Sequence, residues 1–439
     1  MAYFRLSQAQ GLSGFIDTAH NSLQKAFNLA NNTSESERLQ ILAAKYVYQD
    51  KPYKAIEILD QVMKQYPHEL YPYNILYGLY LHELFEPEKS IAKFQYGLIN
   101  NPSAKNLWNM MAYCYTALDR REEALNAINQ YINLAPAEPN PYDSKGDIFA
   151  WFGDYDSSAI LYKKALSFRK DFYSATKLGG YEVLRKNYDE ASKYFQMSDF
   201  KIPVIEIHKG QIIKALKGPG DISDYYRIEL LNETRKYSEM LKLTEKLSKE
   251  LKKDPYNRTN RQEDVARALA KNSKFSEAHK LIKEIQDDVA STTPRSLLIA
   301  NYYSALILFE EGKYEPALKQ FKEVFNSLPP NHEPNYFYAV CLLKCGQLSD
   351  AIDQFGIMKN WFSYTFNILA IPGAQTYWPI AAVKAYYWSG VAYEQLGQRE
   401  KALEEYEEFL DIWKKADFNS PEILDAKTRV AKLKGIASK

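Results

Sequence analysis

The sequence predicts an all-α solenoid of about eleven helix–turn–helix repeats, closed by a C-terminal helix. Two observations predict it: prolines recur at one spacing, and the residues between them have helical periodicity. Pro67, Pro102 and Pro136 lie 35 and 34 residues apart, and each ends a helical pattern. Proline does so because it lacks an amide hydrogen and clashes with the preceding turn. A period of this length indicates units that pack on their neighbours along a continuous core.

The unit at 105–136 shows the two helices most clearly. Trp108 and Met111 recur at helical spacing in its first half, before a short break at "LDRR". Ala124 and Ile128 then recur four residues apart in its second half. Such apolar stripes predict two amphipathic helices. We expect Ala124 to lie where the paired helices approach most closely.

A glycine followed by a small residue recurs between the paired helices. Gly397 precedes Ala402 by five residues, and Gly153 and Gly312 open similar stretches. Gly397 is expected to form the turn, because a residue without a Cβ adopts turn conformations most easily. Ala402 is expected to be the contact point of the second helix on the first, with Gly390 as the small contact residue of the first helix.

The predicted units follow one another along the chain, with two interruptions and a terminal cap. The units are 2–30, 36–67, 71–102, 105–136, 139–170, 172–203, 222–255, 261–290, 298–329, 332–360 and 384–415. Residues 201–223 predict one extra helix, and 360–382 predict an apolar, aromatic insertion. Ser420 is a predicted N-cap before Pro421, and the capping helix spans 420–435. The expected division is an N-terminal block 1–203, an irregular helical segment 204–260 and a C-terminal block 261–436.

This pattern resembles the tetratricopeptide repeat, a helix–turn–helix of about 34 residues. Matching positions in the unit 139–170 are Tyr142, Gly146, Phe149, Gly153, Tyr155, Tyr162 and Ala165. Those in 298–329 are Ala305, Gly312, Tyr314, Ala317, Phe321 and Pro329, and those in 71–102 are Gly78, Phe94, Gly97 and Pro102. The resemblance implies a right-handed superhelix whose first helices line a concave groove that binds peptides or proteins.

The two ends of the chain resemble the repeat regions of certain bacterial signalling proteins. The stretches are "AYFRLSQAQG" at the start and "KALEEYEEFLDIWKKADFNSPEILDAKTRVAKLKG" near the end. In those proteins the repeats follow a serine/threonine kinase or a DNA-binding regulator domain. The resemblance implies that the chain is the regulatory part of a larger signalling protein, although it contains neither His-Arg-Asp nor Asp-Phe-Gly.

Composition and charge favour a neutral protein of a reducing compartment. The 56 Lys and Arg against 55 Asp and Glu give no overall attraction to nucleic acid or to an anionic membrane. No signal peptide is visible, and no apolar run approaches the about 18 residues of a membrane span. The expected location is therefore cytoplasmic. Of the three cysteines, Cys114, Cys341 and Cys345, the last two share a helix face and are expected to be reduced and buried.

No residue pattern predicts catalysis, a metal site or a cofactor. None of the six histidines has a partner at metal-ligand spacing. "KGPGD" is a turn rather than a phosphate-binding loop, and the carboxylate pairs fall on charged outward helix faces. We therefore expect a protein that is not an enzyme.

The candidate binding residues are those off the packing stripe of the first helices. In the N-terminal half they are Asn106, Asn109, Tyr113, Asn140, Asp143, Asp147 and Trp151. In the C-terminal half they are Tyr302, Phe309, Tyr336 and Tyr387. Asparagine suits the backbone of an extended peptide, the aspartates suit its Lys or Arg side chains, and the aromatic residues supply rigid contact area. The alternative for each aromatic residue is packing against the next unit.

Three hypotheses for function remain open. The first is a non-catalytic scaffold or sensor module that binds a peptide or protein segment in the concave groove. The second is a nucleic-acid-binding repeat protein that uses the basic segment 208–274, which has sixteen Lys or Arg against ten Asp or Glu. The third is an enzyme whose site lies in the insertion 360–382. A basic stripe along the groove would favour nucleic acid, and aromatic residues with asparagines would favour peptide.

Overall fold

The computed structural model describes residues 2–12, 16–218, 222–251, 261–329, 335–361 and 374–435. Within these ranges the regular structure is helical and no strand occurs. The first six helix pairs are α1 (Ala2–Leu12) and α2 (Ile16–Asn28), α3 (Glu35–Tyr48) and α4 (Pro52–Gln65), α5 (Tyr71–Gly78) and α6 (Pro87–Asn100), α7 (Lys105–Ala117) and α8 (Arg121–Leu134), α9 (Asn140–Trp151) and α10 (Tyr155–Phe168), and α11 (Ser174–Leu184) and α12 (Tyr188–Met197). The short helices η1 (Ala30–Asn32) and η2 (Leu79–Glu83) lie among them.

Two short helices, α13 (Val204–His208) and α14 (Ile212–Lys217), join the first six pairs to the last five. The later pairs are α15 (Asp224–Glu233) and α16 (Tyr237–Leu251), α17 (Gln262–Lys271) and α18 (Phe275–Val289), α19 (Pro294–Glu310) and α20 (Tyr314–Asn326), α21 (Tyr336–Lys344) and α22 (Leu348–Asn360), and α23 (Ala374–Gln395) and α24 (Arg399–Ile412). Helix α25 (Pro421–Leu433) follows as the predicted cap and packs on α24.

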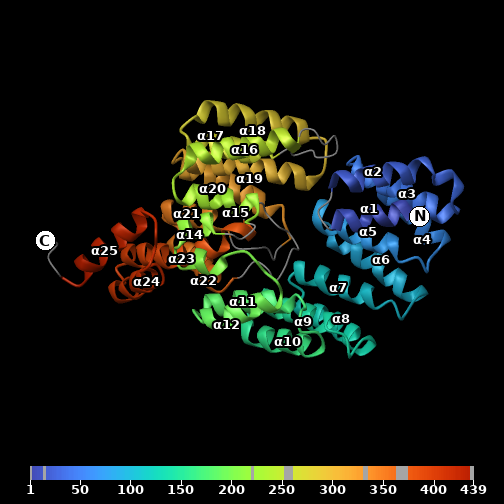
Figure 1. Cartoon of the computed structure of the whole chain (residues 1–439), viewed down its shortest axis with the longest axis horizontal. Coiled ribbons are helices and arrows are strands. Elements are labelled where there is room, and N and C mark those ends of the chain that lie inside the picture. Colours follow the sequence, from blue (N-terminus) through green and yellow to red (C-terminus); the bar gives the residue numbers. More distant parts are fainter. Residues whose placement is uncertain are drawn as a thin grey trace.

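The pairs stack side by side into a helical-repeat solenoid (Figure 1), which confirms the predicted fold class. Each second helix packs on its own first helix and on the first helix of the next unit. The solenoid curves, so α1–α6 and α15–α20 lie on two sides of a central region, and α7–α12 join them along the lower edge of the view. The proposed division into blocks stays a prediction. Helix α11 contacts α22 and η2 contacts α19, so the N-terminal and C-terminal blocks touch each other.

The turns between paired helices contain a residue in the left-handed region. Gly397 has φ 73° there, as predicted, and Asp119 takes the same conformation with φ 60° in the unit that has no glycine. Ala402 is completely buried, as expected of a helix contact. The partner of Gly390 is Tyr406, however, because a Cβ on this glycine would lie 2.7 Å from the Tyr406 ring.

The segment 201–223 contains two short helices rather than the single one expected. Gly210, with φ 73°, separates α13 from α14. It also lies against Trp413 and Ala416, so that a Cβ on it would come within 3.1 Å of either side chain. The interruption in the repeat pattern is therefore a docking point for the last repeat.

The second half of the chain folds back onto the first at this point. The indole Nε1 of Trp413 donates to the backbone carbonyl of His208 at 3.1 Å. The carboxylate of Asp417 accepts from the backbone amides of Ile213 at 2.9 Å and Lys214 at 2.8 Å. Asp417 thereby satisfies amides at the start of α14 that have no partner within the helix.

Two expectations from the sequence need qualification. Cys341 is buried and unpaired as expected, but Cys345 is only half-buried, because α21 ends at the preceding residue and Cys345 lies in the following turn. Most of the predicted insertion 360–382 lies outside the described residues, apart from 360–361 and the start of α23. None of the described helices is long and apolar enough to cross a bilayer.

Candidate functional site

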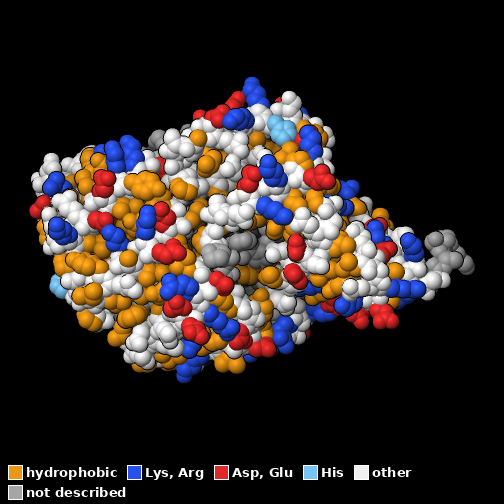
Figure 2. Space-filling view, turned by 180° about the vertical axis from the view of Figure 1, so that it is seen from behind, with side chains coloured by type: hydrophobic (Ala, Val, Ile, Leu, Met, Phe, Trp, Pro, Cys, Tyr) orange, Lys and Arg blue, Asp and Glu red, His pale blue; other side chains and the backbone are white. Residues whose placement is uncertain are grey.

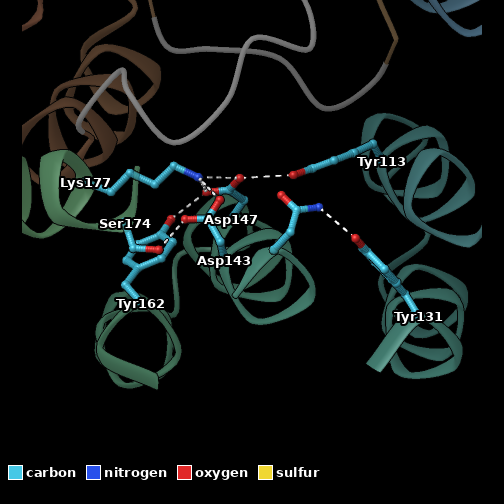
Figure 3. Close-up of polar contacts among 8 residues, drawn as sticks. Tyr113, Tyr131, Asp143, Asp147, Tyr162, Ser174 and Lys177 are labelled. Atoms are coloured by element: carbon cyan, nitrogen blue, oxygen red, sulfur yellow. Dashed lines mark hydrogen bonds and ion pairs between the residues drawn. The ribbon is translucent and has the colours of Figure 1, made fainter. Parts of the chain in front are cut away.

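The predicted aspartates form a buried polar cluster between neighbouring repeats (Figure 3). Asp143 and Asp147 lie one turn apart on α9, and Lys177 reaches them from α11. The Lys177 ammonium lies 2.6 Å from an oxygen of each carboxylate. Ser174 donates to Asp143 at 2.5 Å, and Tyr162 donates to Asp147 at 2.7 Å. The cluster thus joins α9, α10 and α11 through hydrogen bonds to charged groups, which are stronger than neutral ones.

Burial sets the electrostatics of this cluster. It raises the pKa of Asp147 to about 8, although Lys177 acts in the opposite direction. Burial alone would lower the pKa of Lys177, but Asp143 and Asp147 raise it. Two carboxylates share one ammonium, and the charge on Asp143 adds to the effect of burial in raising the pKa of Asp147.

The cluster corrects the expectation that these aspartates face an open groove. Asp143 is 6% exposed and Asp147 is 4% exposed, and the cation predicted to come from a partner is supplied by Lys177 of the same chain. The sequence contained a signal for this, since Lys177 lies 34 residues after Asp143, one repeat period later. The ion pair therefore connects neighbouring repeats.

The remaining N-terminal candidates differ in accessibility. Asn106 is exposed and Asn109 is half-buried. The Oδ1 atom of Asn109 is buried and has no hydrogen-bond partner among the described residues. Tyr113 donates to Asp147 at 3.1 Å, and Asn140 donates to Tyr131 at 3.1 Å, so both of these side chains have partners.

The C-terminal candidates lie largely in the core, which was the alternative considered for the aromatic residues. Tyr302, Tyr336 and Tyr387 are buried, and Phe309 is half-buried against Tyr314 and Phe337. Tyr302 accepts from Asn335, Tyr336 accepts from Trp388 and Tyr387 donates to Asp425. These hydroxyl groups have the partners that buried tyrosines require, so the residues stabilise the stack.

Sequence reasoning missed a second buried ionic cluster in the C-terminal half. Lys384 on α23 lies 2.6 Å from Glu233 on α15 and 2.9 Å from Glu422 on α25. Burial alone would raise the pKa of Glu422, but Lys384 holds it at about 2. Arg267 pairs with Glu229 at 2.6 Å nearby. Glu233 lies far from Lys384 in the sequence, so no local pattern reveals that pair, whereas Glu422 and Glu229 each lie about one repeat from their partners.

An open apolar groove lies between α6, α7 and α8. It has a volume of about 700 Å³, and Trp108, Met111, Tyr115 and Ile99 contribute apolar walls. Ile99 is 79% exposed. The sequence predicted only that Trp108 and its neighbours pack against other helices. Helical periodicity does not show whether the second helices on either side, α6 and α8, close over the apolar face of α7 or leave a groove there.

Several basic side chains of the middle segment are paired with acidic ones among the described residues. Arg261, Arg267 and Lys271 are each engaged by acidic side chains, at 2.9, 2.6 and 2.5 Å respectively. On the face in Figure 2, Lys and Arg side chains are interspersed with Asp and Glu. Nor do His, Cys, Asp and Glu gather into a potential metal site in the described parts of the chain. This arrangement gives nucleic acid no basic stripe to follow on that face.

Comparisons with known proteins match parts of the chain to repeat families. Residues 106–138 and 383–412 match the tetratricopeptide repeat, and residues 287–357 match anaphase-promoting complex, cyclosome, subunit 3. No curated protein matches the chain.

Several solved structures are similar to the chain at low identity. "APC/C hetero-tetramer Cut9-Hcn1" is 14% identical over 92% of this chain and 85% of its own, with a TM-score of 0.35. A thermophilic TPR protein of Thermus thermophilus, TTC0263, is 20% identical over 45% of this chain and 97% of its own, with a TM-score of 0.34. MamA is 18% identical over 38% and 93%, with a TM-score of 0.30.

Proposed function

We propose that the chain, two segments of which match the tetratricopeptide repeat, is a non-catalytic protein–protein interaction scaffold that binds an extended segment of a partner protein. The proposed site is the concave side of α7 and its neighbours, around Asn106 and Asn109. In a larger signalling protein, occupancy of this site would be passed to an effector domain.

The observation that supports this site most directly is the unpartnered carbonyl of Asn109. Its Oδ1 atom is buried without a hydrogen bond among the described residues. Leaving such an atom unpaired costs about 1–3 kcal/mol. Rotation of the half-buried Asn109 side chain would bring this oxygen to the surface, where a backbone amide of a bound segment would satisfy it. Exposed Asn106 is placed to hydrogen-bond the same segment one turn away. An asparagine offers both a donor and an acceptor, as backbone recognition requires.

The aspartates take a different role in this proposal from the one the sequence suggested. Asp143 and Asp147 hold α9 against α11 through Lys177 and do not contact the partner. Ordering an extended segment opposes binding, so we expect a micromolar dissociation constant, about −8 kcal/mol.

The test compares two asparagines on opposite sides of the same repeat. A photo-crosslinking amino acid at position 106 captures the partner from native cells, and the purified partner is then titrated calorimetrically. Asn109→Ala is expected to weaken binding at least tenfold. Asn126→Ala is the matched control, because Asn126 is exposed and lines the groove between α6 and α8. Loss of binding in the control alone would move the site to that groove and refute the concave proposal.

A further inference from the structure

Trp361, from the second half of the chain, contacts α9 in the N-terminal repeats. It follows the last residue of α22, and its ring packs edge-on against Trp151 of α9, with centroids 5.2 Å apart and an interplanar angle of 68°. Trp151 is 7% exposed and Trp361 is 8% exposed. Two residues from opposite halves of the sequence thus bury each other.

Trp151 belongs to the face of α9 that the repeat pattern assigns to a ligand. It lies one turn beyond Asp147 on the same side of the helix. Leu81 and Ala117, from the two preceding repeats, join Trp151 in one core cluster with C-terminal residues. An apolar strip that crosses three repeats on their inner side is therefore covered by the protein's own C-terminal half. Tryptophan is among the residues most often used as a binding anchor.

The attachment of Trp361 allows its side chain to leave this position without unwinding a helix. Helix α22 ends at Asn360, and Trp361 has extended backbone with φ −85° and ψ 123°. Its amide bonds to the carbonyl of Met358 at 3.3 Å. Rotation at this one residue moves the indole, whereas Phe355 and Met358 keep α22 in the core.

Some of the other contacts between the two halves are polar. Thr293 donates to Glu83 at 3.3 Å, and Arg295 lies 4.0 Å from Glu83. Lys186 pairs with Glu408 at 2.5 Å while both side chains remain about one-third exposed. Exposed pairs of this kind contribute little to holding surfaces together.

We propose that Trp361 is an internal ligand of the concave face, occupying on Trp151 the position at which a partner protein places an aromatic anchor, and that partner binding displaces it. The inference rests on the proposed function, since it concerns how the same concave face is regulated. The partner it fits has a tryptophan or phenylalanine exposed in an extended segment. Trp361 then competes as a tethered ligand, at a high effective concentration.

The test uses the full-length chain and a defined probe, the capped tripeptide acetyl-Lys-Asn-Trp-amide, which copies residues 359–361. The control probe is acetyl-Lys-Asn-Ala-amide. The tryptophan probe is expected to bind Trp361→Ala at least tenfold more tightly than the wild-type protein. Binding should disappear with the control probe and when Trp151→Ala is added. Equal affinity for wild type and Trp361→Ala, or binding that survives Trp151→Ala, would overturn the proposal.

A second measurement covers the case in which Trp361→Ala fails to fold. The wild-type protein is labelled with 5-fluorotryptophan, and the fluorine resonance of Trp361 is assigned from the conservative variant Trp361→Phe. Titration with the tryptophan probe is expected to move this resonance to the position of a solvent-exposed indole. A resonance that stays fixed at the highest probe concentration would show that Trp361 is a permanent part of the core.

The outcomes separate this inference from the proposed function. Asn109→Ala should leave binding of the tripeptide within twofold, because the probe reaches only Trp151. If the tripeptide probe binds as expected and Asn109→Ala leaves partner binding unchanged, the asparagine site is refuted while the displacement of Trp361 stands. A fixed Trp361 resonance together with weakened partner binding in Asn109→Ala would refute displacement alone.

Discussion

Replacing Lys177 by methionine is the most direct test of the buried cluster between α9 and α11. The variant leaves Asp143 and Asp147 without the ammonium that lies 2.6 Å from each of them. Both aspartates are at most 6% exposed, so water does not replace the lost cation. Removing one partner from such a buried pair costs about 3–5 kcal/mol of unfolding free energy. We expect a loss within this range at neutral pH and above.

The loss should depend on pH in a defined direction. Burial raises the pKa of Asp147 to about 8, above its ordinary value of 3.8, so the folded state binds more protons than the unfolded state between these values. Stability therefore falls as pH rises through this window. Methionine removes the charge that lowers the pKa of Asp147, so the pKa rises further in the variant. Between about pH 4 and 8 the wild type and the variant therefore lose stability with the same slope, so the deficit of Lys177→Met should be nearly constant there. It should grow above about pH 8, where only the variant's Asp147 still takes up a proton on folding.

Urea denaturation followed by circular dichroism, at several pH values from about 4 to about 9, measures both effects. Lys193→Met is the matched control, because the Lys193 side chain is 69% exposed and pairs only with its helix neighbour Glu190. The control should change stability by no more than about 0.5 kcal/mol at any pH. If Lys177→Met behaves like Lys193→Met at alkaline pH, the cluster does not hold the repeats together and the reasoning is refuted.

Three further predictions follow from helix contacts, a buried histidine and the cysteines. Ala402→Leu should cost about 1–3 kcal/mol in a urea melt, because Ala402 is completely buried between helices, whereas Ala9→Leu on the exposed side of α1 should not. Burial, with a smaller effect of Lys186, lowers the pKa of His208 from its ordinary value of 6.5 to about 3. The stability that the neutral histidine contributes is therefore present above about pH 6.5 and is lost as the pH falls from there towards 3. His208→Phe should flatten that acid limb in a pH series of melts, and an unchanged limb would exclude His208 as its source. Mass spectrometry after brief iodoacetamide treatment should find Cys345 modified first. Cys114 and Cys341 should react only on unfolding, because both are buried and burial raises the pKa of their thiols. A disulfide between Cys341 and Cys345 would contradict this prediction.

The sequence was sufficient to determine the repeat architecture. Proline spacing, helical stripes and the glycine turns depend on neighbours within about one repeat, and such local signals are legible in a single chain. The turn at Gly397, the buried contact of Ala402 and the cap at 420–435 all follow from them. The helical period also places Asp143, Asp147 and Trp151 one turn apart along α9, and their role in a groove stays a prediction.

What fills those positions was decided only by the tertiary structure. Lys177 lies one repeat beyond Asp143, so the sequence spacing hints at this pair and the structure shows the contact. Trp361, by contrast, meets Trp151 only because the solenoid curves until its two halves touch. Curvature is the sum of small rotations between neighbouring repeats, and no local pattern encodes that sum. Asp417 capping α14 and Lys384 joining Glu233 to Glu422 are consequences of the same closure. Local periodicity thus predicts which side chains share a helix face, and the accumulated geometry determines which of them find partners within the chain.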